Sequence, residues 1–248
     1  MTAWRLEWYR LVRTRRLLAL VMVFAFFGFT APVITAYMDQ LVGAAGQGLV
    51  IQAPDPTPEL AVGQFTSNAS QIGVLVAIVV AAGALAFDAR PELATFLRTR
   101  SGSIWQLILP RYVVSTLAIV AAFALGVLAT WYETVVLIGA PDAAGMVVGT
   151  LLTGAYLAFA VAVTALATSL TRSVLTAVAV TVVVLLGLLV LSVVEALAPW
   201  LPSRLIGVLP GLAAGSDAGD HLRALATTVV VTPVLLLLTV RRLERREV

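Results

Sequence analysis

The sequence contains no cysteine and no lysine, and its single histidine is His221. Without cysteine there can be no disulfides, thiolate zinc sites, iron–sulfur clusters or cysteine nucleophiles. Without lysine there can be no phosphate-binding lysine of a P-loop and no Schiff-base chemistry. If ATP drives this protein, another chain must bind the nucleotide.

Charged residues are also scarce, at 12% of the chain, whereas 60% of the residues are hydrophobic and the mean hydropathy is +1.02. Too little polar surface remains to cover a water-soluble globule. We therefore predict an all-α integral membrane protein in which residues 1–248 form a single transmembrane domain. Windows of sustained apolar character predict six transmembrane helices, at residues 17–37, 71–87, 112–132, 146–170, 174–194 and 224–240.

The arginines predict the orientation of these spans, since cytoplasmic segments retain basic residues during insertion. With the N-terminus inside, fourteen of the sixteen basic residues lie in cytoplasmic segments, and Arg204 and Arg223 lie outside. We therefore expect a multi-pass protein of the inner (plasma) membrane with both termini in the cytoplasm. The high pI reflects this topology, and nucleic-acid binding is not expected.

The segment before the first span has the pattern of an amphipathic interfacial helix, with apolar and polar residues at helical spacing on opposite sides. Its apolar side is expected to hold Trp4, Trp8, Leu11 and Val12, and its polar side Glu7, Arg10, Arg13 and Thr14. The alternative is an ordinary basic flank without a helix.

The cytoplasmic loop from residue 88 to residue 111 is long and charged. Pro91 suits the first position of a helix, Glu92 complements the dipole at that end, and Leu93, Phe96 and Leu97 share a face. These features predict a short amphipathic helix that could transmit force from a docked motor. The alternative is a solvated loop with snorkelling arginines.

Two outer segments are rich in proline and glycine. Residues 38–70 are expected to be a connector, because Pro54, Pro56 and Pro58 break helices. Residues 195–223 are too apolar for a free loop and too broken for a span, which favours a re-entrant or interfacial hairpin before the sixth span. An amphipathic periplasmic loop is the alternative.

No catalytic constellation is found, so we expect no enzyme activity, metal site or cofactor site on this chain. A serine protease needs Ser and His together within the membrane, but His221 lies in an outer loop, and HExxH motifs need two histidines. Ionisable residues deep in the spans, which would mark ion relays, are absent, and no polar cluster lies within the spans.

Small residues at helical spacing predict close helix packing in the third and fourth spans. They are Ala118, Ala122, Gly126 and Thr130 in the third span and Gly145, Gly149 and Thr153 in the fourth. For Gly145 and Gly149 an intramolecular contact is a better expectation than a dimer interface.

Taken together, the N-terminal helix, the six spans, the charged loop after the second span and the Pro-rich hairpin resemble the type 2 permease family of ATP-binding-cassette exporters. The loop carries the best local motif, in Glu92, Ala94-Thr95, Phe96-Leu97 and Arg98-Thr99-Arg100-Ser101. Ala94 replaces the family's usual Gly, and the family's Pro before Ser-Arg is missing. The stretch 58–65 and the Arg-rich, Lys-free composition look like actinobacterial members.

This resemblance implies a permease paired with a second permease, identical or related, and driven by two cytoplasmic ATPase subunits that bind ATP and Mg. The implied ATPase interface consists of Glu92, Arg98, Arg100, Trp4, Trp8 and Arg10, and the implied outer gate of Trp200 and Pro202. In such exporters the second and fifth spans line the route, and their apolar composition here favours a hydrophobic or amphiphilic cargo.

Two other interpretations remain open. One is a non-transporting membrane scaffold or sensor that recruits a cytoplasmic partner through the same arginine-rich elements. The other is the substrate-binding membrane component of a vitamin importer, which is expected to enclose a polar-lined cavity.

Overall fold

Six long apolar helices make up most of the computed structural model, which describes residues 3–38, 40, 55–86, 103–171 and 173–245. No strand occurs among these residues, so the prediction of an all-α, six-span membrane protein is confirmed. The spans are α2 (Arg16–Ala36), the continuous run of α4 (Pro58–Asn68), η1 (Ala69–Gly73) and α5 (Val74–Leu85), then α7 (Trp105–Leu137), α8 (Ala143–Leu170), α9 (Val174–Leu191) and α11 (Leu222–Glu244).

The second span begins thirteen residues before the predicted start at Gln71, so the interpretation of residues 58–70 as part of a connector is wrong. Thr57 caps this helix by accepting a hydrogen bond from the Leu60 amide at 3.3 Å, and Pro58 occupies the first turn. Proline is compatible with that position because the amide hydrogen it lacks has no partner there in any case. The sequence signal was read as a helix breaker, although it marks a helix start.

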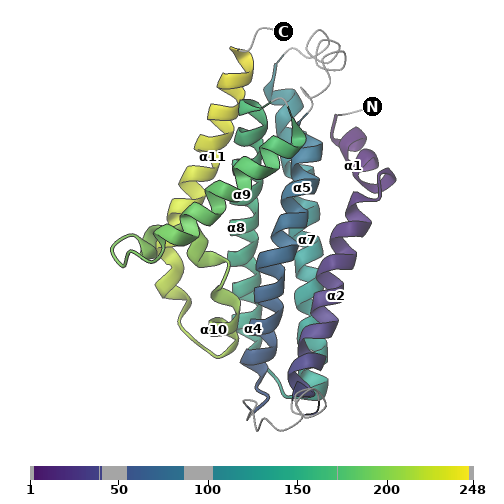
Figure 1. Ribbon diagram of the computed structural model, residues 1–248, viewed down its shortest axis with the longest axis vertical. Coiled ribbons are helices and arrows are strands. Elements are labelled where there is room, and N and C mark those ends of the chain that lie inside the picture. The colour runs from purple at the N-terminus through teal and green to yellow at the C-terminus, as the bar shows by residue number, and fades with distance from the viewer. Residues whose placement is uncertain (1–2, 39, 41–54, 87–102, 172, 246–248) are drawn as a thin grey trace, which may run out of the picture.

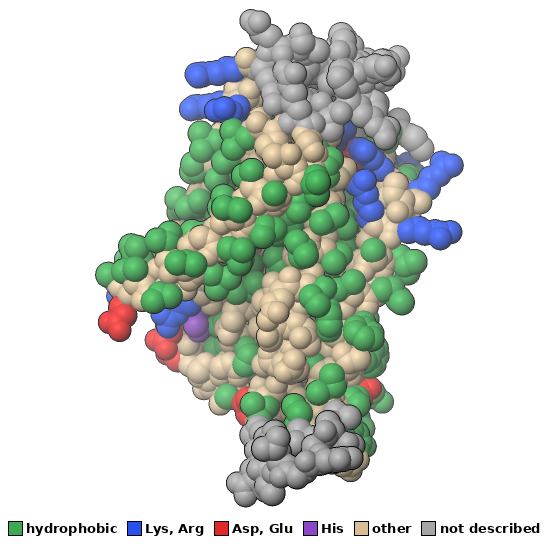
Figure 2. Space-filling model, in the orientation of Figure 1, with side chains coloured by type: hydrophobic (Ala, Val, Ile, Leu, Met, Phe, Trp, Pro, Cys, Tyr) green, Lys and Arg blue, Asp and Glu red, His purple; other side chains and the backbone are tan. Residues whose placement is uncertain are grey.

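Helix α8 lies in the middle of the bundle and is the most buried span, whereas α9 crosses it obliquely (Figure 1). A short helix, α1 (Ala3–Arg13), lies beside the start of α2 and joins it through a turn at Arg15, which has a positive φ of 57°. Both chain ends lie at the same end of the bundle. Basic side chains gather at this end over α1 and α11, and acidic side chains are seen toward the opposite end (Figure 2).

The segment between α9 and α11 is broken into short helical pieces and nevertheless packs into the bundle. Its pieces are η3 (Ala198–Trp200), η4 (Pro202–Leu205), α10 (Val208–Ala213) and η5 (Ala218–His221). Leu205 and Leu209 are fully buried, which explains why this segment is too apolar for a free loop. Its position relative to the bilayer stays a prediction.

Small residues of α8 permit this packing. A Cβ added at Gly145 would collide with the backbone of Leu212, and one at Gly149 would lie 2.6 Å from a methyl carbon of Leu209. The Thr153 hydroxyl donates a hydrogen bond of 3.2 Å to the carbonyl oxygen of Leu205. The predicted intramolecular role of this stripe is confirmed.

Helices α2 and α7 also approach each other closely through glycine. A Cβ at Gly28 would lie 2.5 Å from the carbonyl oxygen of Gly126, and a Cβ at Gly126 would lie 2.8 Å from that of Phe24. These distances are too short for real Cβ atoms, and backbone atoms cannot rotate aside as a side chain can. The close packing predicted for the third span is therefore present.

We expect Gly126→Ala to destabilise the protein by about 1–3 kcal/mol, because the added methyl group must push α2 away from α7. Gly187→Ala is the matched control, since nothing lies within 4 Å of a Cβ at Gly187. Thermal unfolding in detergent would measure both. Equal melting temperatures for the two variants would contradict this account of the α2–α7 contact.

Candidate functional site

A cavity of about 540 Å³ lies between the second span, the fifth span α9 and the broken segment that precedes α11. Ile206, Gly207 and Pro210 close it on the side of the broken segment, and Tyr156 of α8 contributes to its lining. The cavity thus depends on elements that are far apart in the sequence.

The two facing walls of this cavity differ in polarity. The N-terminal half of the second span contributes Thr66, Ser67, Ser70 and Gln71, whereas α9 contributes Val182, Leu185, Leu186 and Leu189. The expectation that no polar cluster lies within the spans was therefore wrong, whereas the apolar composition expected of a transport route stays a prediction. These polar residues had been assigned largely to the outer connector, because the span was predicted to begin at Gln71.

The lining residues of the second span form one continuous stripe along the helix. They are Gly63, Thr66, Ser67, Ser70, Gln71, Val74, Leu75 and Ile78, spaced alternately by three residues and one residue. On an ideal helix of 3.6 residues per turn such a stripe drifts around the axis. The π-helical turn η1 (Ala69–Gly73) is wider and offsets this drift, which keeps the polar and the apolar halves on one face.

Aromatic side chains of α2 and α7 pack against the side of the second span that faces away from the cavity. The ring of Phe123 contacts Phe24 edge-on at 5.7 Å and stacks with Phe65 at 5.8 Å between centroids. A Cβ at Gly73 would lie 2.5 Å from the ring of Phe24, so glycine is needed where η1 meets α2. The wall that carries the polar residues is therefore held by tight packing.

The polar side chains of the wall are already engaged within their helix. The Thr66 hydroxyl donates to the Val62 carbonyl oxygen at 2.8 Å, and the Gln71 amide donates to the Ser67 hydroxyl at 3.3 Å. Their oxygens keep further lone pairs with which to accept a hydrogen bond. Among the described lining residues none is ionisable except Tyr156. This arrangement suits an uncharged molecule with an apolar body and a hydrogen-bonding group.

A second feature lies at the end of the bundle that holds both termini, where α1 is tied to α7 by a buried ion pair. The Nε of Arg111 donates to a carboxylate oxygen of Glu7 at 3.0 Å, and both side chains are at least 90% buried. Arg10 lies 3.8 Å from the same carboxylate. Leu11 packs beside this pair against Val114, so α1 is attached by both charge and apolar contact.

This ion pair corrects the predicted arrangement of α1. The helix itself is confirmed, but Glu7 faces the protein, whereas it was expected on the polar side away from the apolar contacts. Trp4 and Trp8 are about half exposed. They therefore occupy the face suited to the headgroup region, while Glu7 and Leu11 form the face that binds α7.

Sequence reasoning missed Arg111 because the third span was predicted to begin at Tyr112, which left the arginine in a loop. The helix begins at Trp105 instead, and Arg111 is only 5% exposed within it. The apolar residues 104 and 107–109 before Arg111 were the available signal. An arginine between two apolar runs needs a carboxylate partner, and Glu7 supplies one.

The remaining predicted site residues have separate locations. Glu92, Arg98 and Arg100 lie outside the described residues, so their grouping stays a prediction. Trp4, Trp8 and Arg10 all lie on α1.

The residues predicted to form the outer gate lie in the broken segment. Trp200 is exposed in η3, with the Arg223 guanidinium 5.7 Å from its ring centre, and Pro202 is buried in η4. Neither residue lines the 540 Å³ cavity, and their gating role stays a prediction.

Comparisons with known proteins identify no relative: no family model, no curated protein and no solved structure matches the chain. In the part of the chain that the structure describes, no three His, Cys, Asp or Glu side chains are placed to hold a metal ion. The functional argument therefore depends on the cavity, the ion pair and the distribution of charge.

We expect Glu7→Gln to loosen α1 from the bundle, because it breaks the buried ion pair between Glu7 and Arg111, and breaking such a pair costs about 3–5 kcal/mol in comparable sites. Trypsin cleavage after Arg10 and Arg13 should accelerate, and the melting temperature should fall. Glu244→Gln, which changes an exposed acid at the same end, is the control. Unchanged protection of α1 in Glu7→Gln would show that the ion pair does not hold this helix.

Proposed function

We propose that this chain is the membrane-spanning permease subunit of an ATP-driven exporter that moves a hydrophobic or amphiphilic cargo outward. ATP and Mg are bound by a separate cytoplasmic ATPase, and a second permease, identical or related, completes the pathway. The chain lies in the plasma membrane with both termini in the cytoplasm.

The cavity between the second and fifth spans is the observation that carries this proposal. It lies between the two spans that the family resemblance implies as the route, and it joins a hydrogen-bonding wall to an aliphatic wall. A scaffold or sensor needs no such cavity, so its presence favours transport over that alternative. Of the hydrophobic and the amphiphilic cargo that the sequence left open, the polar wall favours the amphiphilic one.

The α1–α7 ion pair supports a route by which a docked ATPase could act on the bundle. A displacement of α1 by the ATPase would be transmitted to α7 through the ion pair between Glu7 and Arg111. Helix α7 in turn packs closely against α2 at Gly126. Arg10 is exposed on the same helix and can meet a partner's carboxylate. The basic end seen in Figure 2 supports its assignment to the cytoplasm.

The polar wall also favours a second candidate, the substrate-binding component of an importer, since such a protein was expected to enclose a polar-lined cavity. The direction of transport separates the two functions. An exporter extrudes a loaded amphiphile from cells or takes it up into inside-out vesicles when ATP is added, whereas an importer does the reverse.

The proposal is tested by purifying the tagged chain from its native membrane in mild detergent and identifying the proteins that accompany it. We expect an ATPase with Walker motifs, whose association is lost or uncoupled in Glu92→Arg and kept in Glu195→Arg, which changes an exposed acid in the turn after α9. Recovery of the chain without any ATPase, from membranes in which known exporters stay assembled, would support the scaffold instead.

Filling the cavity should impair transport of the cargo. Leu186→Trp places a large ring at the cavity wall, and because the ring takes space from the cargo we expect cargo affinity to fall about tenfold, or about 1.4 kcal/mol. Val183→Trp is the control, because Val183 is exposed on the same helix and does not line the cavity. Cargo-stimulated ATP hydrolysis in proteoliposomes would measure both, and equal effects would argue against this cavity as the cargo site.

A further inference from the structure

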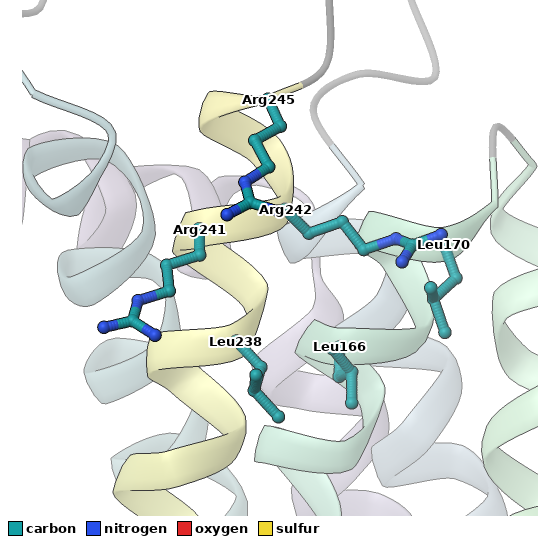
Figure 3. A pocket seen from close by; sticks show the side chains of 6 residues that line it. All are labelled: Leu166, Leu170, Leu238, Arg241, Arg242 and Arg245. Atoms are coloured by element: carbon teal, nitrogen blue, oxygen red, sulfur yellow. The ribbon is translucent and has the colours of Figure 1, made fainter.

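A second cavity, of about 420 Å³, lies where the C-terminal ends of α8 and α11 meet, away from the cavity described above. Three leucines and three arginines line it among the described residues: Leu166, Leu170, Leu238, Arg241, Arg242 and Arg245 (Figure 3). No other described residue contributes to it. Its described lining therefore combines long apolar side chains with positive charge, and no acid is among these six residues.

The two kinds of side chain are separated along the axis of α11. Figure 3 shows Leu238 and Leu166 between the two helices and Arg242 and Arg245 nearer the chain end, while the Arg241 side chain extends on the other side of α11. Arg242 extends across toward Leu170 at the end of α8. Leu170 and Leu238 are 44% and 46% exposed, so these leucines offer an apolar surface that the bundle itself does not cover.

The three guanidinium groups have no ion pair with any carboxylate of the described residues. The other basic group at this end of the bundle differs, because Glu7 lies among Arg10, Arg16 and Arg111. Arginines in the last turn of a helix also interact favourably with its dipole. The interaction with the helix dipole does not explain why leucines lie beside the arginines, or why a second helix contributes to the cavity.

We propose that this cavity binds an anionic phospholipid of the surrounding bilayer, with the phosphate on the arginines and the start of an acyl chain on the leucines. Guanidinium groups are well matched to phosphate oxygens, and leucine matches hydrocarbon. The boundary between charge and hydrocarbon on α11 coincides with the end of a transmembrane helix, where headgroups lie. A bound lipid would join α8 to α11 at this end of the bundle.

Lipid is favoured over an acidic protein segment by the exposed leucines, since a soluble acidic peptide would leave them uncovered. A neutral lipid would cover the leucines and leave three cations without a partner. The proposal depends only on the membrane location of the chain, so it stands or fails independently of the exporter assignment.

The test uses the purified full chain in a nonionic detergent, without partner proteins. Dioleoyl phosphatidylglycerol and dioleoyl phosphatidylcholine are titrated separately, and native mass spectrometry counts the bound lipid. The site variant is Arg241→Gln, Arg242→Gln and Arg245→Gln together. The matched control is Arg5→Gln, Arg13→Gln and Arg15→Gln, which removes three exposed arginines at the same end. Circular dichroism verifies that both variants remain folded.

We expect phosphatidylglycerol to bind the unchanged protein and the control, and to bind the site variant on the order of a hundredfold more weakly, since each basic residue near an anionic lipid contributes about fivefold. Leu170→Gln should weaken lipid binding while it leaves the charge unchanged, which tests the acyl contact separately.

Three results would overturn the proposal. Equal binding of phosphatidylcholine, or an equal loss in the control variant, would indicate nonspecific adsorption. Displacement of the lipid by the same concentration of glycerol 3-phosphate would indicate a soluble phosphate ligand. Full lipid binding by the site variant, with loss of a co-purifying protein from membranes carrying it, would indicate a protein partner.

Discussion

The close contact between α8 and the broken segment at residues 202–213 determines the shape of the cavity. Gly145 and Gly149 let the backbone of this segment approach α8, and hydrogen bonds from Thr153 to Leu205 and from the Asp142 amide to Ala213 secure it. Backbone that is not helical must find its hydrogen-bond partners within the protein wherever lipid replaces water. Only because this segment is held against α8 can Ile206 and Pro210 close one side of the cavity.

Hydropathy and the arrangement of small residues predicted the architecture well, because both follow from the requirement to face lipid or another helix. The six spans and the packing at Gly126, Gly145 and Gly149 could be predicted for this reason. The start of the second span could not be predicted, because many of its first residues are polar and because proline favours the first turn of a helix but breaks the middle of one. The polar wall of the cavity was missed as a direct consequence.

The ion pair between Glu7 and Arg111 could not be predicted from the sequence for a different reason. Glu7 and Arg111 are 104 positions apart, and each is flanked by residues that make it look like an ordinary charge near the membrane surface. Helical spacing placed Glu7 opposite the tryptophans, but it could not indicate that α1 has two apolar environments, lipid on one side and α7 on another. Pairing of that kind depends on tertiary packing, which a single sequence does not encode locally.

Charge is distributed unevenly in this molecule: basic side chains gather at the end that holds both termini, and the described lining of the larger cavity contains no Arg, Lys, Asp or Glu. Moving one elementary charge through a membrane potential of 100 mV changes the free energy by about 2.3 kcal/mol. A neutral occupant of a neutral cavity moves no charge, so its passage would be electrically silent. The membrane voltage could then neither drive nor oppose that movement, and directed transport would require another source of energy.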